Sequence, residues 1–520
     1  MRLIKDHLIR LPILIRNIMT LDTQVKMAEF PDLKKTIAAL IKKTQAIYLS
    51  DAIPWVIGYS GGKDSTAALQ LVWYALKKLP KEKRIKPVYV ISTDTLVENP
   101  IVAQWVEQSL VAMKVAATKQ NLPILPQRLL PEVTDRFWVN LIGRGYPAPR
   151  PKFRWCTSRL KINPSNRFIN EVIRQNGQVI LVLGTRKAES AVRSANMTKY
   201  EQASTREQLA THASLPNSWI YTPIAEWSND EVWQYLIEVN NPWGYSNQDL
   251  FNLYRGATSG GECPLVVDTS TPSCGDSRFG CYVCTLVEQD KSMQAMIQND
   301  EDKQWLLPLI ELRNQWLDIK EDRQHRDFRR MNGNLTIFNQ RLVHGPYKQN
   351  YREQLLTALL KAQQTVREHG PAAVKSLELI SLVELEEIRR IWVMEKHEIE
   401  DKLPSLYEAV TGQSYPGKRL ENQSIFKAAD LELLKTVCQP SGDEEGLHFQ
   451  LIRELLHLEQ QYRTLTRRAG LYDALDKALE RHAFNNAQEA EEFALRRELA
   501  RTQAKLEPTD SDLTTLPLFR

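Results

Sequence analysis

The chain has 520 residues, of which 42% are hydrophobic and 25% are charged, which is typical of a globular protein with about two to four domains. Its net charge of +5 is too small for the whole surface to attract nucleic acid, so any nucleic-acid-binding surface must be local. Six cysteines are too few for a disulfide scaffold, and no signal-peptide pattern opens the sequence, so we expect a reducing cytoplasm.

The N-terminal segment, residues 1–50, is expected to form helices. Its first residues are apolar, but Arg10 and Arg16 interrupt them before the roughly 18 apolar residues that a membrane span requires. We therefore expect an amphipathic helix and no membrane partner.

Three apolar runs follow, at residues 55–59, 87–93 and 179–184, and they are rich in β-branched residues. Such runs are typical of strands buried on both faces of a parallel sheet. Between the first two, apolar residues recur at helical spacing from Ser65 until Pro80 ends the pattern. Strand, helix and strand in this order predict an α/β fold with a right-handed crossover.

Beyond residue 290 the strand pattern fades and charged helical stretches predominate. We predict a mostly helical region at 291–520, with a hairpin in the turn-rich segment that begins at Asn332. The helical stretches are 301–323, 351–368, 376–402 and 447–507. In the last of them, apolar residues share one helix face, which predicts packing within this region or, alternatively, partner docking. These residues are Leu451, Leu455, Leu458, Tyr462 and Leu465.

The segment from Tyr59 to Ser65, YSGGKDS, follows the first predicted strand and opens a helix. Backbone N–H groups and the helix dipole converge at such a turn, so it suits a phosphate group. It is not the common P-loop, because Ile57 and Asp64 stand where that motif has Gly and Ser or Thr. The alternative is an ordinary glycine-containing turn.

SGGKDS resembles the PP-loop of the ATP pyrophosphatase family, whose members split ATP between the α and β phosphates. The resemblance implies a doubly wound parallel sheet of the HUP-like kind, with ATP and Mg²⁺ as cofactors. It also implies that Asp94 and Thr95, after the second strand, receive the adenosine. The implied phosphate-binding residues are Ser60, Gly61, Gly62, Lys63, Asp64 and Ser65, and Ser60, Lys63, Asp64 and Ser65 are also expected to be catalytic.

Two later segments are similar to phosphoadenylyl-sulfate (PAPS) reductases. The first is GTRKAES, which begins at Gly184 and is followed by Arg193; the second is WSNDEVWQYL, which begins at Trp227. With the PP-loop they define a predicted domain at 51–290. The resemblance implies that Gly184, Arg186 and Arg193 bind an anion, with Arg186 also catalytic, and the alternative is a pair of surface arginines.

Five of the six cysteines fall in this predicted domain, and the sixth, Cys438, is expected to be structural. Cys281 and Cys284 have C-x-x-C spacing, which fits zinc, a redox dithiol or an iron-sulfur cluster. The segment WCTSRLK around Cys156 resembles the C-C-x-x-R-K segment that shares a [4Fe-4S] cluster in assimilatory sulfate reductases, although Trp155 replaces its first cysteine. The resemblance implies a [4Fe-4S] cluster on Cys156, Cys281, Cys284 and a fourth cysteine, for which we favour Cys274 over Cys263; Cys263 is then a candidate persulfide carrier and catalytic residue.

Residues 137–170 contain no acidic residue but many basic and aromatic ones, a mixture that suits a nucleic-acid backbone. A loop that serves only ATP, or a solvated surface, is the alternative. Arg154 and Arg159 flank Cys156 and would favour its thiolate form.

The combination of these motifs with a long helical extension resembles the DndC family, the sulfurtransferases of bacterial DNA phosphorothioation. This resemblance implies adenylylation of a DNA phosphate by ATP and replacement of a non-bridging oxygen by sulfur. Implied partners are DNA, a cysteine desulfurase as sulfur donor and other Dnd-system proteins. The alternatives are a PAPS or APS reductase, a tRNA thiolation enzyme, and a non-enzymatic, ATP-sensing subunit that docks on DNA.

Overall fold

The computed structural model describes residues 33–506 apart from residues 203, 213, 259–278, 319, 419–427, 439–445, 464 and 466. Residues 1–32 of the predicted N-terminal segment therefore lie outside the described residues, as do Cys263 and Cys274. No helix in the described part of the chain is both long and apolar enough to cross a membrane.

Within the described residues, six strands form one sheet in the order β3-β2-β1-β4-β6-β5. Neighbouring strands are parallel except β5, which is antiparallel to β6. The expected α/β fold class with a doubly wound sheet is confirmed. The strands are β1 (Trp55–Gly58), β2 (Val88–Thr93), β3 (Ile124–Leu129), β4 (Val179–Val182), β5 (Ala210–Thr211) and β6 (Ser218–Tyr221).

The strand order reverses at β1. The chain moves outward from β1 to β2 and β3, and then returns to place β4 on the other side of β1. Ile57 of β1 is level with Val90 of β2 and with Val182 of β4, so the carboxyl ends of the three strands lie at one edge of the sheet. In open sheets of this kind, ligands bind outside the carboxyl ends at the point of reversal.

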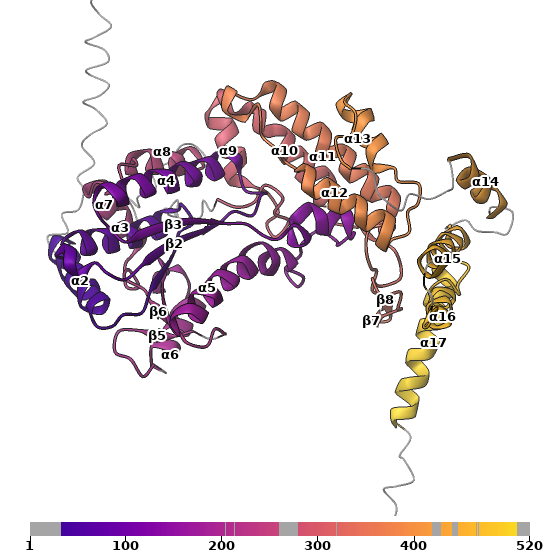
Figure 1. Cartoon of the computed structure of the whole chain (residues 1–520), viewed down its shortest axis with the longest axis horizontal. Helices are drawn as coiled ribbons and strands as arrows, with labels where there is room; N and C mark the ends of the chain where they lie inside the picture. The colour runs from indigo at the N-terminus through magenta and orange to yellow at the C-terminus, as the bar shows by residue number, and fades with distance from the viewer. Residues whose placement is uncertain are drawn as a thin grey trace, which may run out of the picture.

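Helices cover both faces of the sheet, because successive residues of a strand point to opposite faces. Ile57 packs with Leu69 of α3, whereas its neighbour Val56 packs with Ile169 of α5 on the other side. Figure 1 shows α3 and α4 on one side of the sheet and α5 on the other. These helices are α3 (Lys63–Lys77), α4 (Pro100–Lys119) and α5 (Asn163–Asn176).

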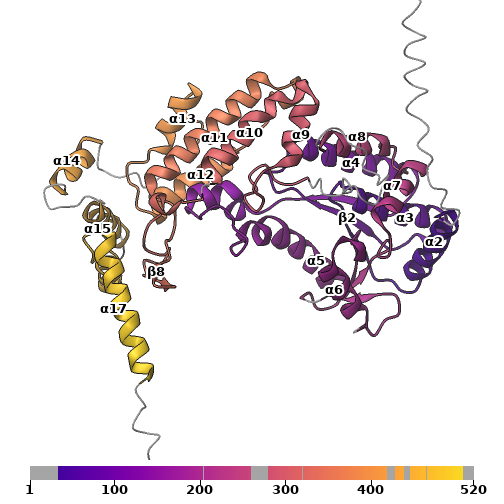
Figure 2. The same cartoon turned by 180° about the vertical axis from the view of Figure 1, so that it is seen from behind.

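Further helices pack on the outer side of α3. Ala68 and Leu71 of α3 share a hydrophobic cluster with Ile41 of α2 and Trp233 of α7. Figure 2 shows α2, α7 and α8 on this side of the sheet and α6 on the side of α5. The bounds are α2 (Leu33–Leu49), α6 (Ala191–Gln202), α7 (Asn229–Glu238) and α8 (Asn247–Gly256).

The rest of the described chain is mostly helical, and the predicted hairpin is confirmed as β7 (Ile337–Phe338) paired with β8 (Arg341–Leu342). The expectation of one helical stretch over 376–402 is wrong: α12 and a following turn end at Glu395, and His397 and Asp401 have positive φ angles. The helices are α9 (Lys291–Asn299), α10 (Leu307–Leu312), α11 (Gln349–His369), α12 (Leu382–Arg390), α13 (Leu403–Thr411), α14 (Ala428–Cys438), α15 (Leu447–Arg463), α16 (Leu471–Arg481) and α17 (Ala487–Leu506).

The face of α15 that is buried differs from the predicted apolar seam. Leu458 is buried, but so are the polar residues Arg453, Glu454 and His457. Leu465 lies beyond the end of the helix and is 51% exposed. Hence α15 turns a charged face, as well as leucines, toward its neighbours.

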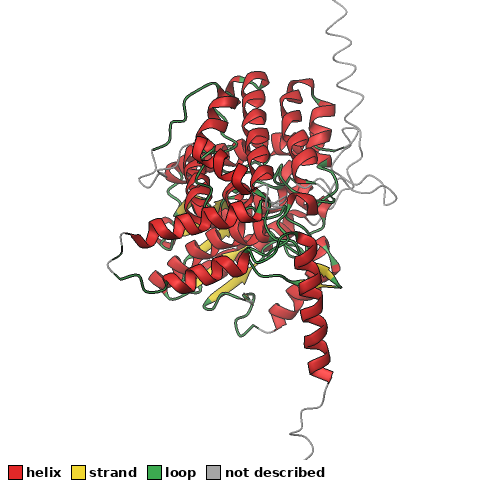
Figure 3. Ribbon diagram, turned by 90° about the vertical axis from the view of Figure 1, so that its right-hand side faces the viewer, coloured by secondary structure: helices red, strands yellow, loops and turns green. Residues whose placement is uncertain are grey.

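A hydrophobic core joins segments that follow β2 and β3 to the helical region. Trp138 and Ile142 belong to the same buried cluster as Leu355 of α11 and Ile391 after α12. The indole N–H of Trp392 also donates to the carbonyl oxygen of Ile142 at 2.9 Å. Figure 3 shows the strands among the surrounding helices. The core crosses the predicted boundary at residue 290, and the boundary itself stays a prediction.

Candidate functional site

The glycine turn after β1 is shaped for close backbone approach. Gly61 has a φ of +74°, and a Cβ atom at that position would lie 2.4 Å from Cγ2 of Val106. Gly62 caps α3, and no side chain among the described residues caps this helix end. The backbone N–H of Lys63 donates to the Tyr254 hydroxyl at 3.3 Å. The turn therefore presents a helix N-terminus on which an anion can rest.

Two cations converge on the carboxylate of Asp64. The ammonium of Lys63 lies 2.9 Å from one oxygen, and Nε of Arg186 lies 2.7 Å from the other. Lys63 and Arg186 are buried, at 7% and 4% exposure. Because the two buried cations share this one carboxylate, the site keeps a positive charge that suits an anion, and the shared carboxylate can also bind Mg²⁺.

The hydroxyls of Ser60 and Ser65 lie close together in the same turn. The Oγ atoms of Ser60 and Ser65 are 3.1 Å apart, and the Ser60 N–H donates to Oγ of Ser65. Ser65 donates in turn to the carbonyl oxygen of Gly62. These bonds hold both predicted serines at the start of α3.

Gly184 brings the segment after β4 against the turn. A Cβ atom at Gly184 would lie 2.6 Å from the carbonyl oxygen of Asp64, so a larger residue would separate the two segments. Arg186 also donates to the carbonyl oxygen of Trp227 at 3.1 Å. The predicted residue Arg193 is half exposed and pairs with Glu189, which accepts the Arg186 N–H. Arg193 and Thr185 line a cavity of about 450 Å³ beside this edge of the sheet.

Asp94 and Thr95, after β2, face different partners. Asp94 pairs with Arg128 of β3 and accepts the N–H of Leu96 at 2.7 Å. Thr95 is fully buried, and its hydroxyl lies 3.5 Å from Sγ of Cys281. These adjacent residues therefore connect the carboxyl edge of the sheet to the cysteines.

The C-x-x-C loop lies against the segment that follows Thr95. Glu98 forms a β-bridge with Cys281, and the N–H of Tyr282 donates to the carbonyl oxygen of Val97 at 3.0 Å. The loop is closed by a bond of 3.0 Å from the Cys284 N–H to the carbonyl oxygen of Cys281. Both cysteines thus depend on the path that the chain takes out of β2.

The third described cysteine of this region lies beside the pair. Burial lowers the pKa of the Lys161 ammonium, but surrounding groups outweigh burial and raise it. Those groups are the Cys281 thiol, the Glu98 carboxylate, and the thiols of Cys156 and Cys284. Three thiols from two segments, the C-x-x-C loop and the segment of Cys156, therefore lie near one ammonium group.

At Cys156 and Cys281, burial decides the direction in which the thiol pKa is shifted. Burial raises the pKa of Cys156, and burial raises the pKa of Cys281 to about 11. The expectation that flanking arginines favour the Cys156 thiolate is wrong, because Arg159 pairs with Asp135 at 2.5 Å and Arg154 is exposed. Thiols with raised pKa values stay protonated at neutral pH unless a metal or a cation displaces the proton.

The donor set at this position is incomplete within the described residues. They contain no group of three or more His, Cys, Asp or Glu arranged to hold a metal ion. The predicted ligand Cys274 and the predicted persulfide carrier Cys263 lie outside those residues. Trp155, which stands where the family has a cysteine, is stacked on Phe137 with ring centroids 5.3 Å apart.

An arginine from the helical region holds the C-x-x-C loop in place. Arg313 is 2% exposed and donates to the carbonyl oxygens of Cys284 at 3.0 Å and Glu288 at 2.8 Å, and also to that of Val287. Its charge is balanced by Asp318 at 2.8 Å. Sequence reasoning missed Arg313, because an isolated arginine in a helical stretch carries no motif.

Most of the basic stretch is neutralised by carboxylates from other segments. Arg144 pairs with Glu395, Arg150 with Asp322, Arg159 with Asp135 and Arg167 with Glu132. The exceptions lie in a tight turn closed by the bridge between Arg150 and Phe153. There Lys152 and Arg154 are exposed and have no acidic partner in the described part of the chain, and Phe153 is 43% exposed between them.

Comparison with known proteins gives a match over the same part of the chain. Residues 54–285 match the family model of the phosphoadenosine phosphosulfate reductase domain. An uncharacterized protein of Methanocaldococcus jannaschii is 25% identical over 252 residues, which are 48% of this chain and 40% of that protein. The match thus spans less than half the length of this curated relative.

Two solved structures are also similar. A PAPS reductase from Candida auris in a phosphate complex is 13% identical, with 41% of this chain and 87% of that chain covered and a TM-score of 0.25. The FMN adenylyltransferase of Candida glabrata in complex with FAD and inorganic pyrophosphate is 14% identical, with 45% and 66% covered and a TM-score of 0.25.

Replacing Arg313 by Met should loosen the cysteine loop. Three carbonyl groups lose a charged donor, so we expect a loss of about 3 kcal/mol in the free energy of unfolding. Hydrogen exchange of residues 281–288 and the reaction rate of Cys284 with a thiol reagent should both rise. Arg174→Met is the matched control, because Arg174 is 76% exposed and pairs only with Glu171 on its own helix. Unchanged exchange in Arg313→Met would show that the loop is held by other contacts.

Proposed function

Because the chain contains a PAPS reductase-like domain, we propose that it is an ATP-dependent sulfurtransferase of the DndC kind, which places sulfur on a DNA backbone phosphate. The observation that carries the proposal is the connection from the glycine turn to the cysteines. Asp94 directly follows β2, the strand next to β1, and its neighbour Thr95 contacts Cys281. A nucleotide-activating site and a sulfur-handling site would therefore be adjacent in one fold.

The first half of the reaction would use the glycine turn. A non-bridging oxygen of a DNA phosphate attacks the α phosphorus of ATP, and pyrophosphate leaves. Lys63, the hydroxyls of Ser60 and Ser65, and the amides of the turn would stabilise the charge on the leaving pyrophosphate. Asp64 would bind Mg²⁺, and Arg186 would hold the carboxylate in place.

The second half would replace the activated oxygen by sulfur. The outer sulfur of a cysteine persulfide attacks the DNA phosphorus, and AMP leaves with the oxygen that it had activated. A second thiol then attacks the inner sulfur, so that a disulfide forms and the phosphorothioate is released. Cys263 is our candidate persulfide carrier, and a cysteine desulfurase would supply its outer sulfur.

The described thiols suit an iron-sulfur cluster in their chemistry, because iron-sulfur clusters are held by thiolate ligands. Cys156, Cys281 and Cys284 would provide three ligands, and Cys274 the fourth. A bound cluster would keep these thiols deprotonated and fix the loops on which they lie. Thr95 would orient Cys281, and Arg313 would hold the loop that carries Cys284.

The turn that carries Lys152, Phe153 and Arg154 would contact DNA. Its two cations have no acidic partner among the described residues and lie just before Cys156 in the sequence, and Phe153 offers an exposed ring on which a base can stack. Other Dnd-system proteins would select the DNA sequence.

Sulfur transfer is tested with labelled cysteine. The protein, a cysteine desulfurase, ATP and ³⁵S-cysteine are mixed with DNA or with tRNA, and both label and pyrophosphate are measured. We expect ATP-dependent label in DNA, and Ser60→Ala should lower both signals by about tenfold to a hundredfold. Ser50→Ala, at an exposed position after α2, is the control. Label confined to tRNA, or sulfite release from PAPS, would contradict the proposal.

The cluster is tested by anaerobic purification with iron, sulfide and zinc analysis. Cys156→Ser, Cys281→Ser and Cys284→Ser should each lose most of the iron, because a cluster with three thiolates is more easily released. Cys438→Ser should retain it, since Cys438 ends the distant helix α14. Stoichiometric zinc without iron would contradict the cluster and would indicate a structural zinc site instead.

The DNA contact is tested by the salt dependence of affinity. Replacing both Lys152 and Arg154 by Gln removes two cations, so the slope of log affinity against log salt should fall by about two. Arg174→Gln, at an exposed site on α5, should leave the slope unchanged. An unchanged slope in the double variant would mean that DNA binds elsewhere.

A further inference from the structure

A second cavity, far from the sheet in sequence, lies within the helical region. It has a volume of about 620 Å³ and is bordered by the segment before the hairpin, the start of α11, the segment after α12, and helices α15 and α16. Its size is that of a small-molecule site. The lining residues that matter here are Arg329, Arg352, Lys396, His397, Phe449 and Arg453.

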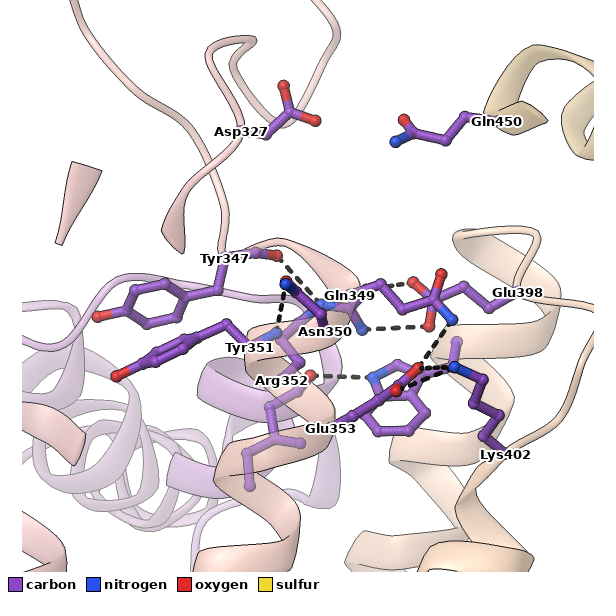
Figure 4. Close-up of polar contacts among 12 residues, drawn as sticks. Asp327, Tyr347, Gln349, Asn350, Tyr351, Arg352, Glu353, Glu398, Lys402 and Gln450 are labelled. Carbon is purple, nitrogen blue, oxygen red and sulfur yellow. Dashed lines mark hydrogen bonds and ion pairs between the residues drawn. The ribbon is translucent and has the colours of Figure 1, made fainter. Parts of the chain in front are cut away.

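The carboxylates of its wall are already paired. Arg352 pairs with Glu398, Arg329 with Asp327 at 2.7 Å, and Arg453 with Glu400 at 2.9 Å. In the same wall Arg481 pairs with Glu454, and Lys402 pairs with Glu353 at 3.1 Å. Figure 4 shows the residues around Arg352, Glu398, Glu353 and Lys402 on one side and Asp327 and Gln450 across from them. These carboxylates are therefore not available to a further cation.

Among the lining cations that are not exposed, Lys396 is the one that this pairing leaves without a carboxylate in the described residues. It lines the cavity and is only partly exposed, yet within the described residues its ammonium has no hydrogen-bond acceptor and no carboxylate within 4.0 Å. Burial, followed by the charge of Arg352, lowers its pKa to about 8. A partly buried ammonium without a counter-ion lowers the stability of the fold, and an anion bound in the cavity would remove this loss.

Two further polar atoms of the wall also lack partners in the described part of the chain. They are Nε of Arg453, whose side chain is 5% exposed, and Nδ1 of His397. Burial, followed by the neighbouring groups His457, Arg481 and Arg453, lowers the pKa of His397 to about 3. The cavity lining contains nine Lys and Arg residues against six Asp and Glu residues, so it carries an excess of positive charge.

We propose that this cavity binds a small phosphate-bearing molecule, with the ammonium of Lys396 as the donor to the phosphate oxygens. A planar guanidinium and a lysine ammonium are the usual partners of phosphate, and both are present here in a partly enclosed space. Neutral or apolar ligands are disfavoured, because they would leave the Lys396 charge unpaired. Binding in this cavity would not require the proposed sulfur transfer.

The test measures the binding of inorganic phosphate and of AMP to the full-length protein by calorimetry. Phosphate alone reports the free anion, and tighter binding of AMP reports an esterified phosphate; either supports the proposal where Lys396→Met weakens it, because AMP can also bind at the glycine turn. Lys396→Met should weaken binding by about tenfold or more, because it removes a charge-assisted hydrogen bond while it keeps most of the side-chain volume. Lys402→Met is the matched control, since Lys402 lies in the same wall but is paired. Ser60→Ala should retain binding, because the glycine turn is a separate site.

A second readout separates binding from folding. Without ligand, Lys396→Met should melt no lower than the native protein, because an unpaired partly buried charge is replaced by an apolar group. Phosphate should raise the melting temperature of the native protein and of Lys402→Met but not that of Lys396→Met. The proposal is overturned if phosphate and AMP fail to bind, if the lysine variants lose binding equally, or if Lys396→Met binds phosphate normally.

Discussion

Strand β1 is hydrogen-bonded in parallel to β2 on one side and to β4 on the other, and the whole candidate site depends on this arrangement. It brings the ends of three strands to one edge, so that the glycine turn meets the Asp94 and Gly184 segments. Asp64 and Arg186, 122 residues apart in the chain, are thereby placed 2.7 Å from each other. The strands are buried on both faces, and a shift in register would expose apolar side chains, so packing fixes the geometry of the charged site.

Charge in this protein is largely compensated by distant residues. The run from residue 137 to 170 is basic in sequence, yet its arginines meet carboxylates that lie before it or in the helical region, such as Asp135 and Asp322. The cations that lack an acidic partner are therefore more informative about binding sites than the net charge of the chain. Two such places within the described residues are the turn with Lys152 and Arg154 and the cavity that contains Lys396.

The helical region is part of the architecture of the site. Arg313 holds the C-x-x-C loop through backbone carbonyl groups, and the N–H of Tyr347 donates to the carbonyl oxygen of Gly145 at 2.6 Å in the loop that leads toward Cys156. A Cβ atom at Gly145 would lie 2.9 Å from the carbonyl oxygen of Tyr347, so the segments of Gly145 and Tyr347 are in close contact. Changes within the helical region can thus reach the thiols through rigid contacts.

The sequence by itself determined the α/β class, three central strands, the glycine turn and the hairpin, because these features are encoded by local patterns of burial, glycine and turn residues. It did not predict β3, β5 and β6, which are short or border the sheet and carry weaker patterns. Nor could it identify the partners of Asp64, the role of Arg313 or the unpaired state of Lys396. Those were decided by tertiary structure alone, since the energy of a charge depends on which distant groups surround it and not on its neighbours in the chain.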